Sequence, residues 1–430
     1  MSTGAIMSRL RDFHPAALTT GLTAFIFYAF GALPLQIEVA EQLGLSATES
    51  SSWIFIVWIV GAVISIALGL FYRLPMPVTW TIPGLVFIGS LSGQFSFAEI
   101  VGANLMAGVV IVALGLAGIG KRIMAWLPLP IVMAMFGGSI LVYVTRMISA
   151  TVQDVTIAGV TVVGYLLGRF IDNPRLPPMA LAAIGGGIAL ALTGTTPTAP
   201  IAWSLPAVAM PEMDFTIGAF FAVSVPMVVL AMGLGNVQGL GFLMAQGYRP
   251  PLTVTTVSVG FASILNAMFG GHPATVARTG VAILGGPDAG PAERRYWANI
   301  VASALTIAVA FGAATVTSLV EILPRTFVIT LAALAILSSL QGALEKAFSD
   351  KLRFGALVAF AVAATPFAIF GISSAFWSIV IGVAASFAAE RKDLLAYWRR
   401  GRDEPEASSD SDVPPPRPNP ASIASAPANP

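Results

Sequence analysis

One arginine stands within an apolar stretch that could enter a membrane. Arg278 lies in PATVARTGVAILG, residues 273–285, and we expect it to be the only charged residue near the middle of the bilayer. A charged side chain is costly in lipid, so such a residue is kept to bind a ligand or to pair with another polar group. A carboxylate suits a guanidinium, since it accepts two parallel hydrogen bonds. Arg278 is therefore the first candidate for binding an anion, and a clamp to backbone carbonyls or an inner acid is the structural alternative.

Two short segments, 78–92 and 273–285, would position this chemistry. Both are interrupted by Pro and Gly, and we expect each to begin extended and to continue as a half-helix. Pro83 suits the first turn of the first half-helix, and Thr279 suits the N-cap of the second. The free N–H groups at a helix N-terminus favour negative charge. If the segments enter the membrane from opposite sides, both N-termini meet near Arg278 and form an anion site.

Polar and aromatic residues around these segments are candidates for contacting a substrate. Trp80 could stack on a planar ligand. Asn236 and Gln238 could hydrogen-bond a substrate or bridge helices, whereas Phe27 and Tyr28 could line a site or face lipid and core. The expected substrate-binding residues are Thr79, Trp80, Thr81, Ile82, Thr275, Ala277, Arg278, Thr279, Asn236, Gln238, Phe27 and Tyr28.

His272 could carry a proton, because imidazole titrates near neutral pH; a hydrogen-bonded turn residue after FGG is the alternative. The chain has two histidines and no cysteine, so disulfides are impossible and metal or haem sites are not expected. No nucleophile–base pair or phosphate-binding loop is evident in the sequence. We therefore expect no catalytic residues, no metal and no cofactor, and a protein that is not an enzyme.

The composition is that of a protein embedded in lipid. Hydrophobic residues make up 56% of the 430 residues and charged residues 10%, and the mean hydropathy is +0.84. A soluble domain has about 25% charged residues, so soluble proteins, peripheral enzymes and single-pass receptors are excluded. The net charge of +1 gives no reason to expect a nucleic-acid partner.

Fourteen apolar segments, separated by Gly, Pro and charged residues, predict an all-α polytopic membrane protein. They lie at 16–33, 52–71, 78–92, 99–118, 127–148, 154–171, 179–193, 216–235, 252–268, 273–285, 296–319, 326–345, 354–370 and 374–390. The tail from 401 to 430 is rich in Pro, Ser and Ala, and we expect it to be disordered.

The basic residues indicate the orientation of the chain in the bilayer. With the N-terminus in the cytoplasm, most of the 22 Lys and Arg residues fall in inner loops, Lys346 among them, and the exceptions are Arg146, Arg278 and Arg325. This bias is typical of cytoplasmic loops. The expected outer loops carry acids, including Glu38 and Glu41, but no Lys or Arg; these loops are 34–51, 92–98 and 194–214. Both termini, and the tail, are therefore expected in the cytoplasm.

The two interrupted segments also align with each other. PVTWTIPGLVFIG (77–89) and PATVARTGVAILG (273–285) match at a constant offset of 196, with identities at Pro77/Pro273, Thr79/Thr275, Gly84/Gly280 and Gly89/Gly285. Each is the third of seven apolar segments in its half. Because seven is odd, the second half would enter the membrane from the opposite side. This pattern indicates a 7+7 inverted repeat, which is typical of secondary transporters; chance similarity between apolar Gly/Pro-rich stretches is the alternative.

Three stretches resemble the benzoate:proton symporter (BenE) family: FGGHPATVARTGVAILGGPDAGP (269–291), GNVQGLGFLMAQGYRPP (235–251) and PVTWTIPG (77–84). The resemblance extends to about residue 395. It implies a bacterial inner-membrane symporter that imports benzoate or a related aromatic carboxylate with protons. It also implies the fold of the uracil and xanthine permeases and of sulfate-type anion transporters, which suggests a homodimer by analogy.

In that fold a core domain moves against a gate domain like an elevator. The resemblance assigns spans 1–4 and 8–11 to the core domain, residues 1–118 and 212–319. It assigns spans 5–7 and 12–14 to the gate domain, residues 119–195 and 320–395. The substrate would lie between the two half-helices, with its carboxylate on Arg278 and its ring against Trp80.

The chain departs from its nucleobase-transporting relatives at two positions. Those permeases carry a glutamate that corresponds to Met232 or Gly233 here, and a second near Arg278 and Thr279. Their absence argues against a nucleobase and leaves the proton carrier open between His272 and the bound carboxylate itself. Several sulfate-type transporters place a basic residue near the position of Arg278. The alternatives are a transporter of another anion or of a nucleobase, an anion channel, or a motor-like structural protein on the same fold.

Overall fold

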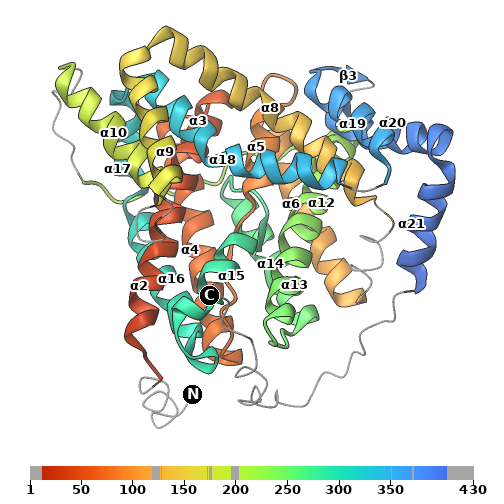
Figure 1. Cartoon of the computed structure of the whole chain (residues 1–430), viewed down its shortest axis with the longest axis horizontal. Helices are drawn as coiled ribbons and strands as arrows, with labels where there is room; N and C mark the ends of the chain where they lie inside the picture. The colour runs from red at the N-terminus through yellow and green to blue at the C-terminus, as the bar shows by residue number, and fades with distance from the viewer. Residues whose placement is uncertain are drawn as a thin grey trace.

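The chain folds into a bundle of helices that contains two short β-strands in its interior. The structure is a computed structural model and describes residues 12–118, 126, 128–171, 173, 177–194, 203–349, 351–369 and 372–403. Figure 1 shows α2, α4 and α16 side by side on one flank of the bundle, although α16 is more than two hundred residues from α2 in the sequence.

The first half of the chain contains one strand, β1 (Val78–Trp80). Its helices are α2 (Pro15–Ile26), the π-helix η1 (Phe27–Ala32), α3 (Leu33–Gln42), α4 (Ala47–Tyr72), α5 (Ile82–Ser90), α6 (Phe97–Ala117), α8 (Leu129–Gln153), the π-helix η2 (Val155–Gly159), α9 (Val160–Ile171) and α10 (Pro178–Leu192).

The second half also contains a short strand followed directly by a short helix. One long helix is built from α11 (Ile217–Ala219), η3 (Phe220–Ser224), α12 (Val225–Val229), η4 (Leu230–Asn236) and α13 (Val237–Ala245). It is followed by α14 (Leu252–Met268), strand β2 (Ala274–Val276), α15 (Arg278–Leu284), two 3₁₀ turns (Pro287–Ala289 and Ala292–Arg294), α16 (Tyr296–Phe311), α17 (Ala313–Ile322), α18 (Arg325–Phe348), α19 (Arg353–Ala364), the strands β3 (Ala368–Ile369) and β4 (Ile372–Ser373), α20 (Ser374–Ala389) and α21 (Arg391–Asp403).

Each of the fourteen apolar segments expected from the sequence contains a helix. Within the described residues, six helices are long and apolar enough to cross a membrane: Pro15–Gln42, Ala47–Tyr72, Phe97–Ala117, Leu129–Gln153, Ile217–Ala245 and Arg325–Phe348. The prediction of an all-α membrane protein is therefore confirmed in kind. The number of crossings and the inverted repeat stay predictions.

Two boundaries expected from the sequence are wrong. The first helix does not end at 33 but continues to Gln42, because no glycine with a left-handed backbone occurs before Gly44 (φ +68°). Glu38 and Glu41 therefore lie in a helix and not in an outer loop. The eighth helix continues past 235 to Ala245 and stops before Gly247 (φ +84°).

Two further boundaries lie near the C-terminus. The thirteenth helix ends at Ala364, two residues before Pro366, which cannot continue a helix. Helix α21 reaches Asp403 and so enters the tail expected to be disordered from 401. Residues 404–430 of that tail lie outside the described residues.

Capping boxes fix the starts of two membrane helices. Ser46 accepts a hydrogen bond from the Glu49 N–H at the start of α4, and the Glu49 carboxylate accepts one from the Ser46 N–H. Ser96 and Glu99 do the same at α6. These reciprocal bonds satisfy N–H groups that a helix leaves free.

Strands β1 and β2 pair antiparallel where the two interrupted segments cross. Thr79 pairs with Thr275, its partner in the sequence alignment, and Val78 and Trp80 pair with Val276 and Ala274. Two further backbone bonds extend the ladder beyond the strands, from the Thr81 N–H to the Pro273 carbonyl (3.1 Å) and from the Ala277 N–H to the Pro77 carbonyl (2.9 Å). The extended backbone at this depth is thus largely satisfied by the partner strand, as a membrane interior requires.

Candidate functional site

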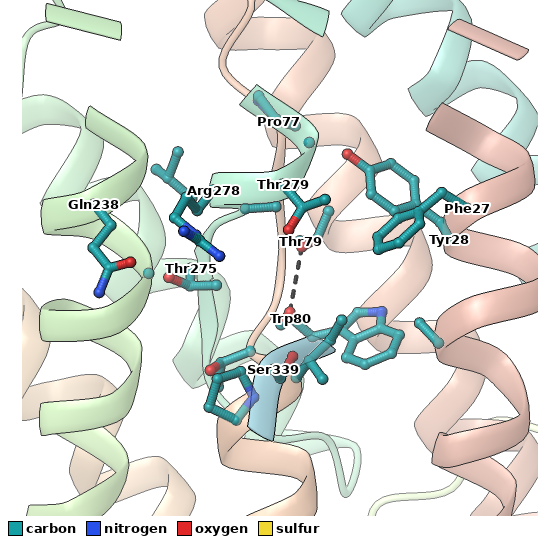
Figure 2. Close-up of a pocket in the computed structure, with 18 of the residues that line it drawn as sticks. Phe27, Tyr28, Pro77, Thr79, Trp80, Gln238, Thr275, Arg278, Thr279 and Ser339 are labelled. Carbon is teal, nitrogen blue, oxygen red and sulfur yellow. Dashed lines mark hydrogen bonds between the residues drawn. The ribbon is translucent and has the colours of Figure 1, made fainter. Parts of the chain in front are cut away.

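A cavity of about 430 Å³ opens beside the crossing strands (Figure 2). Its walls come from the β1–α5 and β2–α15 segments and from η1, α4, α8, α9, α13, α16 and α18. The volume is in the usual range for small-molecule sites. Figure 2 shows Arg278 facing Gln238 on one side, with Phe27, Tyr28 and Trp80 on the other.

Side chains from neighbouring helices hold the two strands in place. The Ser65 hydroxyl on α4 accepts from the Val78 N–H (2.7 Å) and donates to the Val78 carbonyl (2.9 Å). The Ser263 hydroxyl on α14 accepts from the Ala274 N–H (2.9 Å). Asn236 accepts from the Val276 N–H through its Oδ1 (2.8 Å). Each bond satisfies a buried backbone group that would otherwise be unpaired.

Asn236 and Thr275 thus have structural tasks. Asn236 is buried and does not line the cavity. Thr275 reaches the cavity, but its hydroxyl donates to the Ala231 carbonyl at 2.7 Å. Gly235 makes this packing possible, because a Cβ there would collide with Thr275 Oγ1. Asn236 therefore joins η4 to strand β2, which is closer to the expected bridging role than to substrate binding.

One end of the cavity is cationic. Arg278 is the first residue of α15, is exposed to the cavity, and makes no hydrogen bond or ion pair with any residue that the structure describes. Lys346, in the last turn of α18, lines the same cavity, and its Nζ donates to Gln238 Oε1 at 2.9 Å. The two charges thus lie on either side of Gln238, which Arg278 faces in Figure 2.

Lys346 was expected in an inner loop and not at the site. The structure extends the helix through Phe348, which places Lys346 on the cavity wall. A signal for this was present: Ser339, Gly342 and Lys346 recur at helical spacing, and all three line the cavity. Arg278 is therefore not the only charged residue beside the strand crossing.

The other end of the cavity is aromatic. Phe27 and Tyr28 come from the π-helix η1, a distortion that is frequent at functional sites. The Trp80 ring lies 6.1 Å from that of Trp58, and the Trp58 indole N–H donates to Gln36 Oε1 at 2.9 Å. The Tyr28 hydroxyl is buried without a hydrogen-bond partner in the part of the chain described. These rings form an apolar wall that suits a flat ligand.

His272 lies behind this wall and does not line the cavity. Its side chain is fully buried, and its Nδ1 accepts from the Trp53 indole N–H at 2.9 Å. Its ring packs edge-on against Trp80 at 5.4 Å. An imidazole that accepts at Nδ1 in an apolar setting is the neutral form, with its proton on Nε2.

The other substrate-binding candidates all line the cavity: Phe27, Tyr28, Thr79, Trp80, Thr81, Ile82, Gln238, Thr275, Ala277, Arg278 and Thr279. One detail is wrong. Thr279 does not cap α15, because the strand ladder ends at Ala277 and the helix starts at once, with Ala277 as an N-cap that offers no side-chain bond. In α5, Pro83 does lie in the first turn, and Thr81 is the N-cap whose hydroxyl accepts from the Gly84 N–H (3.3 Å).

The site therefore combines a flat apolar wall with an unpaired guanidinium. Among the described residues, no group of His, Asp and Glu side chains is placed to hold a metal ion. The arrangement can bind a small anion that has an apolar body, with charge at one end and ring at the other.

Sequence comparisons identify relatives over nearly the whole chain. Residues 11–388 match the family model described as "Benzoate membrane transport protein". The inner membrane protein YdcO of Escherichia coli (strain K12) is 26% identical over 379 residues, which cover 87% of this chain and 96% of the relative. The benzoate membrane transport protein of Acinetobacter baylyi is 25% identical over 382 residues, covering 88% and 96%.

Solved structures show the same fold at low identity. The transmembrane domain of the cyanobacterial bicarbonate transporter BicA superposes with a TM-score of 0.59 at 17% identity, covering 86% of this chain and 98% of that one. The murine Slc26a9 anion transporter in its inward-facing state gives a TM-score of 0.56 at 13% identity, covering 90% and 71%. The fold is thus that of membrane transporters.

Proposed function

The chain belongs to the benzoate membrane transport protein family, and we propose that it imports benzoate or a related aromatic carboxylate together with a proton. It is a membrane transporter and not an enzyme. The proposal concerns the identity of the substrate, its co-transport with a proton and the mechanism of transport.

The observation that carries the proposal is the unpaired Arg278 guanidinium at the edge of an aromatic cavity. An arginine within a membrane is costly unless it is paired, and no carboxylate of the described residues forms an ion pair with Arg278. A substrate carboxylate would supply the missing charge and accept hydrogen bonds from two of the guanidinium N–H groups. The uncapped start of α15 offers further N–H donors.

The opposite wall accounts for the rest of the substrate. Benzoate is a flat apolar ring with one carboxylate. Its ring would lie among Phe27, Tyr28 and Trp80 while its carboxylate reaches Arg278. An inorganic anion would leave the aromatic wall without a partner, and a nucleobase would leave the guanidinium unneutralised.

We further propose that transport follows an elevator motion of the core domain against the gate domain. The packing supports this division: α2 and α4 pack on α16 and α6 packs on α14 within the core, whereas α8 packs on α18 and α19 within the gate. The cavity lies between the two groups. It extends to the end of α18 that carries Lys346, which the orientation of basic residues assigns to the cytoplasmic side. The structure would then be an inward-facing state.

The cellular location and the orientation of the protein are also part of the proposal. The relative in Escherichia coli is named an inner membrane protein. We propose a multi-pass protein of a bacterial inner membrane with both termini in the cytoplasm, fourteen crossings in two inverted halves, and assembly as a homodimer.

A binding assay on purified protein in detergent tests the substrate, because neutral benzoic acid crosses bilayers unaided. Wild type is compared with Arg278→Gln and with Arg249→Gln, a matched charge removal at an exposed arginine outside the cavity. The ligands are benzoate, salicylate, uracil and sulfate.

We expect benzoate to stabilise wild type and Arg249→Gln, and Arg278→Gln to bind at least about tenfold more weakly, since a hydrogen bond to a charged group contributes about 1.5–3 kcal/mol. Stabilisation by uracil or sulfate alone would discard the proposed substrate. Unchanged benzoate binding in Arg278→Gln would discard the proposed site.

A further inference from the structure

Three cationic side chains line the cavity, those of Arg169, Arg278 and Lys346, and within the part of the chain that the structure describes no acidic side chain forms an ion pair with Arg278 or Lys346. Arg278 makes no hydrogen bond or ion pair with the residues described. Lys346 donates only to Gln238, whose side chain is a neutral amide, and forms no ion pair within the described chain. Glu345 also lines the cavity; its carboxylate accepts from Gln341 Nε2 at 2.7 Å and forms no ion pair with the residues described.

Arg278 and Lys346 come from helices on opposite sides of the proposed division into core and gate domains. Arg278 begins α15, which packs on α13 and α2. Lys346 lies in the last turn of α18, which packs on α8. Lys346 bonds Gln238, which Arg278 faces across the cavity, so the two like charges lie on the same part of the cavity wall and repel each other. One anion between them would remove the repulsion and form two charge-assisted contacts.

We propose that Lys346 is a second anion-binding residue, which holds the substrate carboxylate from the α18 side while Arg278 holds it from the α15 side. On binding, the Lys346 ammonium exchanges its hydrogen bond to Gln238 for one to the carboxylate. The role of benzoate rests on the proposed function. The role of Lys346 in selecting an anion over a neutral ring compound is the new inference.

A structural role for Lys346 is the rival explanation, since its bond to Gln238 joins α18 to α13. The two explanations differ in what they predict for an uncharged ligand. A residue that binds the carboxylate affects benzoate and leaves benzamide, which has the same ring and no charge, unaffected. A residue that only joins helices affects both ligands equally.

The experiment measures dissociation constants of benzoate, benzamide and sulfate for wild type, Lys346→Gln, Lys346→Arg and Lys351→Gln. Lys351→Gln is the matched control, because Lys351 is paired with Asp393 on the surface at 2.6 Å. We expect Lys346→Gln to weaken benzoate binding about tenfold or more and to leave benzamide unchanged. Lys346→Arg should recover most of the affinity, and Lys351→Gln should match wild type.

A double variant that combines Lys346→Gln with Arg278→Gln provides an independent test. If both cations hold one carboxylate, the loss in the double variant is smaller than the product of the two single losses, because neighbouring sites are not additive. Unchanged benzoate binding in Lys346→Gln, or equal losses of benzoate and benzamide, would overturn the proposal. A wild type that binds sulfate but not benzoate refutes the proposed substrate, while the sulfate affinity of Lys346→Gln still decides the role of Lys346. A wild type that binds neither anion overturns both.

Discussion

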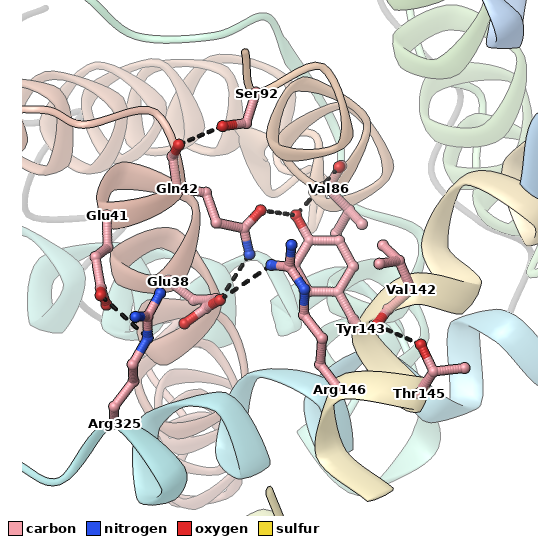
Figure 3. A network of polar contacts seen from close by, with 10 residues as sticks. All are labelled: Glu38, Glu41, Gln42, Val86, Ser92, Val142, Tyr143, Thr145, Arg146 and Arg325. Atoms are coloured by element: carbon pink, nitrogen blue, oxygen red, sulfur yellow. Dashed lines mark hydrogen bonds and ion pairs between the residues drawn. The ribbon is translucent and has the colours of Figure 1, made fainter. Parts of the chain in front are cut away.

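Arg146 on α8 reaches across to Glu38 on α3, with its Nη1 3.6 Å from Glu38 Oε1 (Figure 3). The Glu38 side chain is only 1% exposed, whereas that of Arg146 is 46% exposed. Gln42 Nε2 donates to the same carboxylate oxygen at 2.6 Å, and the Tyr143 hydroxyl on α8 donates to Gln42 Oε1 at 3.2 Å. The buried Glu38 on α3, in the proposed core domain, is thus linked to α8, in the proposed gate domain.

A second and more exposed ion pair lies beside it. Arg325 on α18 is 3.2 Å from Glu41, and the two side chains are 66% and 43% exposed. Arg146 and Arg325 are two of the three basic residues that broke the inner-side pattern in the sequence. Their partners on α3 account for both exceptions, and the third, Arg278, lines the cavity.

The two pairs should differ in their contribution to stability. Arg146→Ala leaves the Glu38 carboxylate buried without its counter-charge, so we expect a loss of about 1.5–3 kcal/mol. Arg325→Ala removes an exposed pair and should cost less than about 1 kcal/mol. Thermal unfolding in detergent compares the two, and adding Glu38→Gln to Arg146→Ala should recover part of the loss. Equal losses in the two arginine variants would contradict this explanation.

Ser65 should be required for both folding and the site. Its hydroxyl bonds both backbone groups of Val78, so Ser65→Ala leaves a buried N–H and a buried carbonyl without partners. Each unsatisfied group costs about 1–3 kcal/mol. We expect a lower unfolding temperature and weaker benzoate binding. Ser149→Ala is the control, because that exposed hydroxyl bonds only its own helix, and it should change stability by less than about 0.5 kcal/mol.

Two glycines of the eighth helix provide a matched pair of substitutions. A methyl group at Gly235 would collide with Thr275 Oγ1, whereas one at Gly241 would meet open space. Gly235→Ala should destabilise the protein by about 1–3 kcal/mol through this overpacking and should weaken ligand binding. Gly241→Ala should be neutral or stabilising by about 0.5–1 kcal/mol, because alanine favours a helix. If both variants unfold at the wild-type temperature, Gly235 of η4 and Thr275 of β2 are not in the close contact described here.

Local signals in the sequence located most of the site. Pro and Gly interruptions marked the strand crossing, and Arg278 stood out because charge is rare in apolar segments. Lys346 and Glu38 were missed for a shared reason: both lie near helix ends, where the sequence does not distinguish a solvated residue from a buried one. Asn236 was ambiguous because an amide serves a ligand or a backbone equally well. Only the packing of η4 on β2 decides that it bonds the Val276 N–H.

His272 allows the proton carrier to be tested. Charging this imidazole would displace the Trp53 N–H from Nδ1 and bury a charge without a partner, so we expect it to stay neutral during transport. His272 would then not be the proton carrier. Calorimetric titration of benzoate in two buffers of different ionisation enthalpy measures the protons taken up on binding. His272→Gln should weaken benzoate through its contact with Trp80 and leave proton uptake as in wild type. The control His14→Gln, at the N-cap of α2, should change neither quantity. Loss of one proton per benzoate in His272→Gln alone would assign the proton to this imidazole.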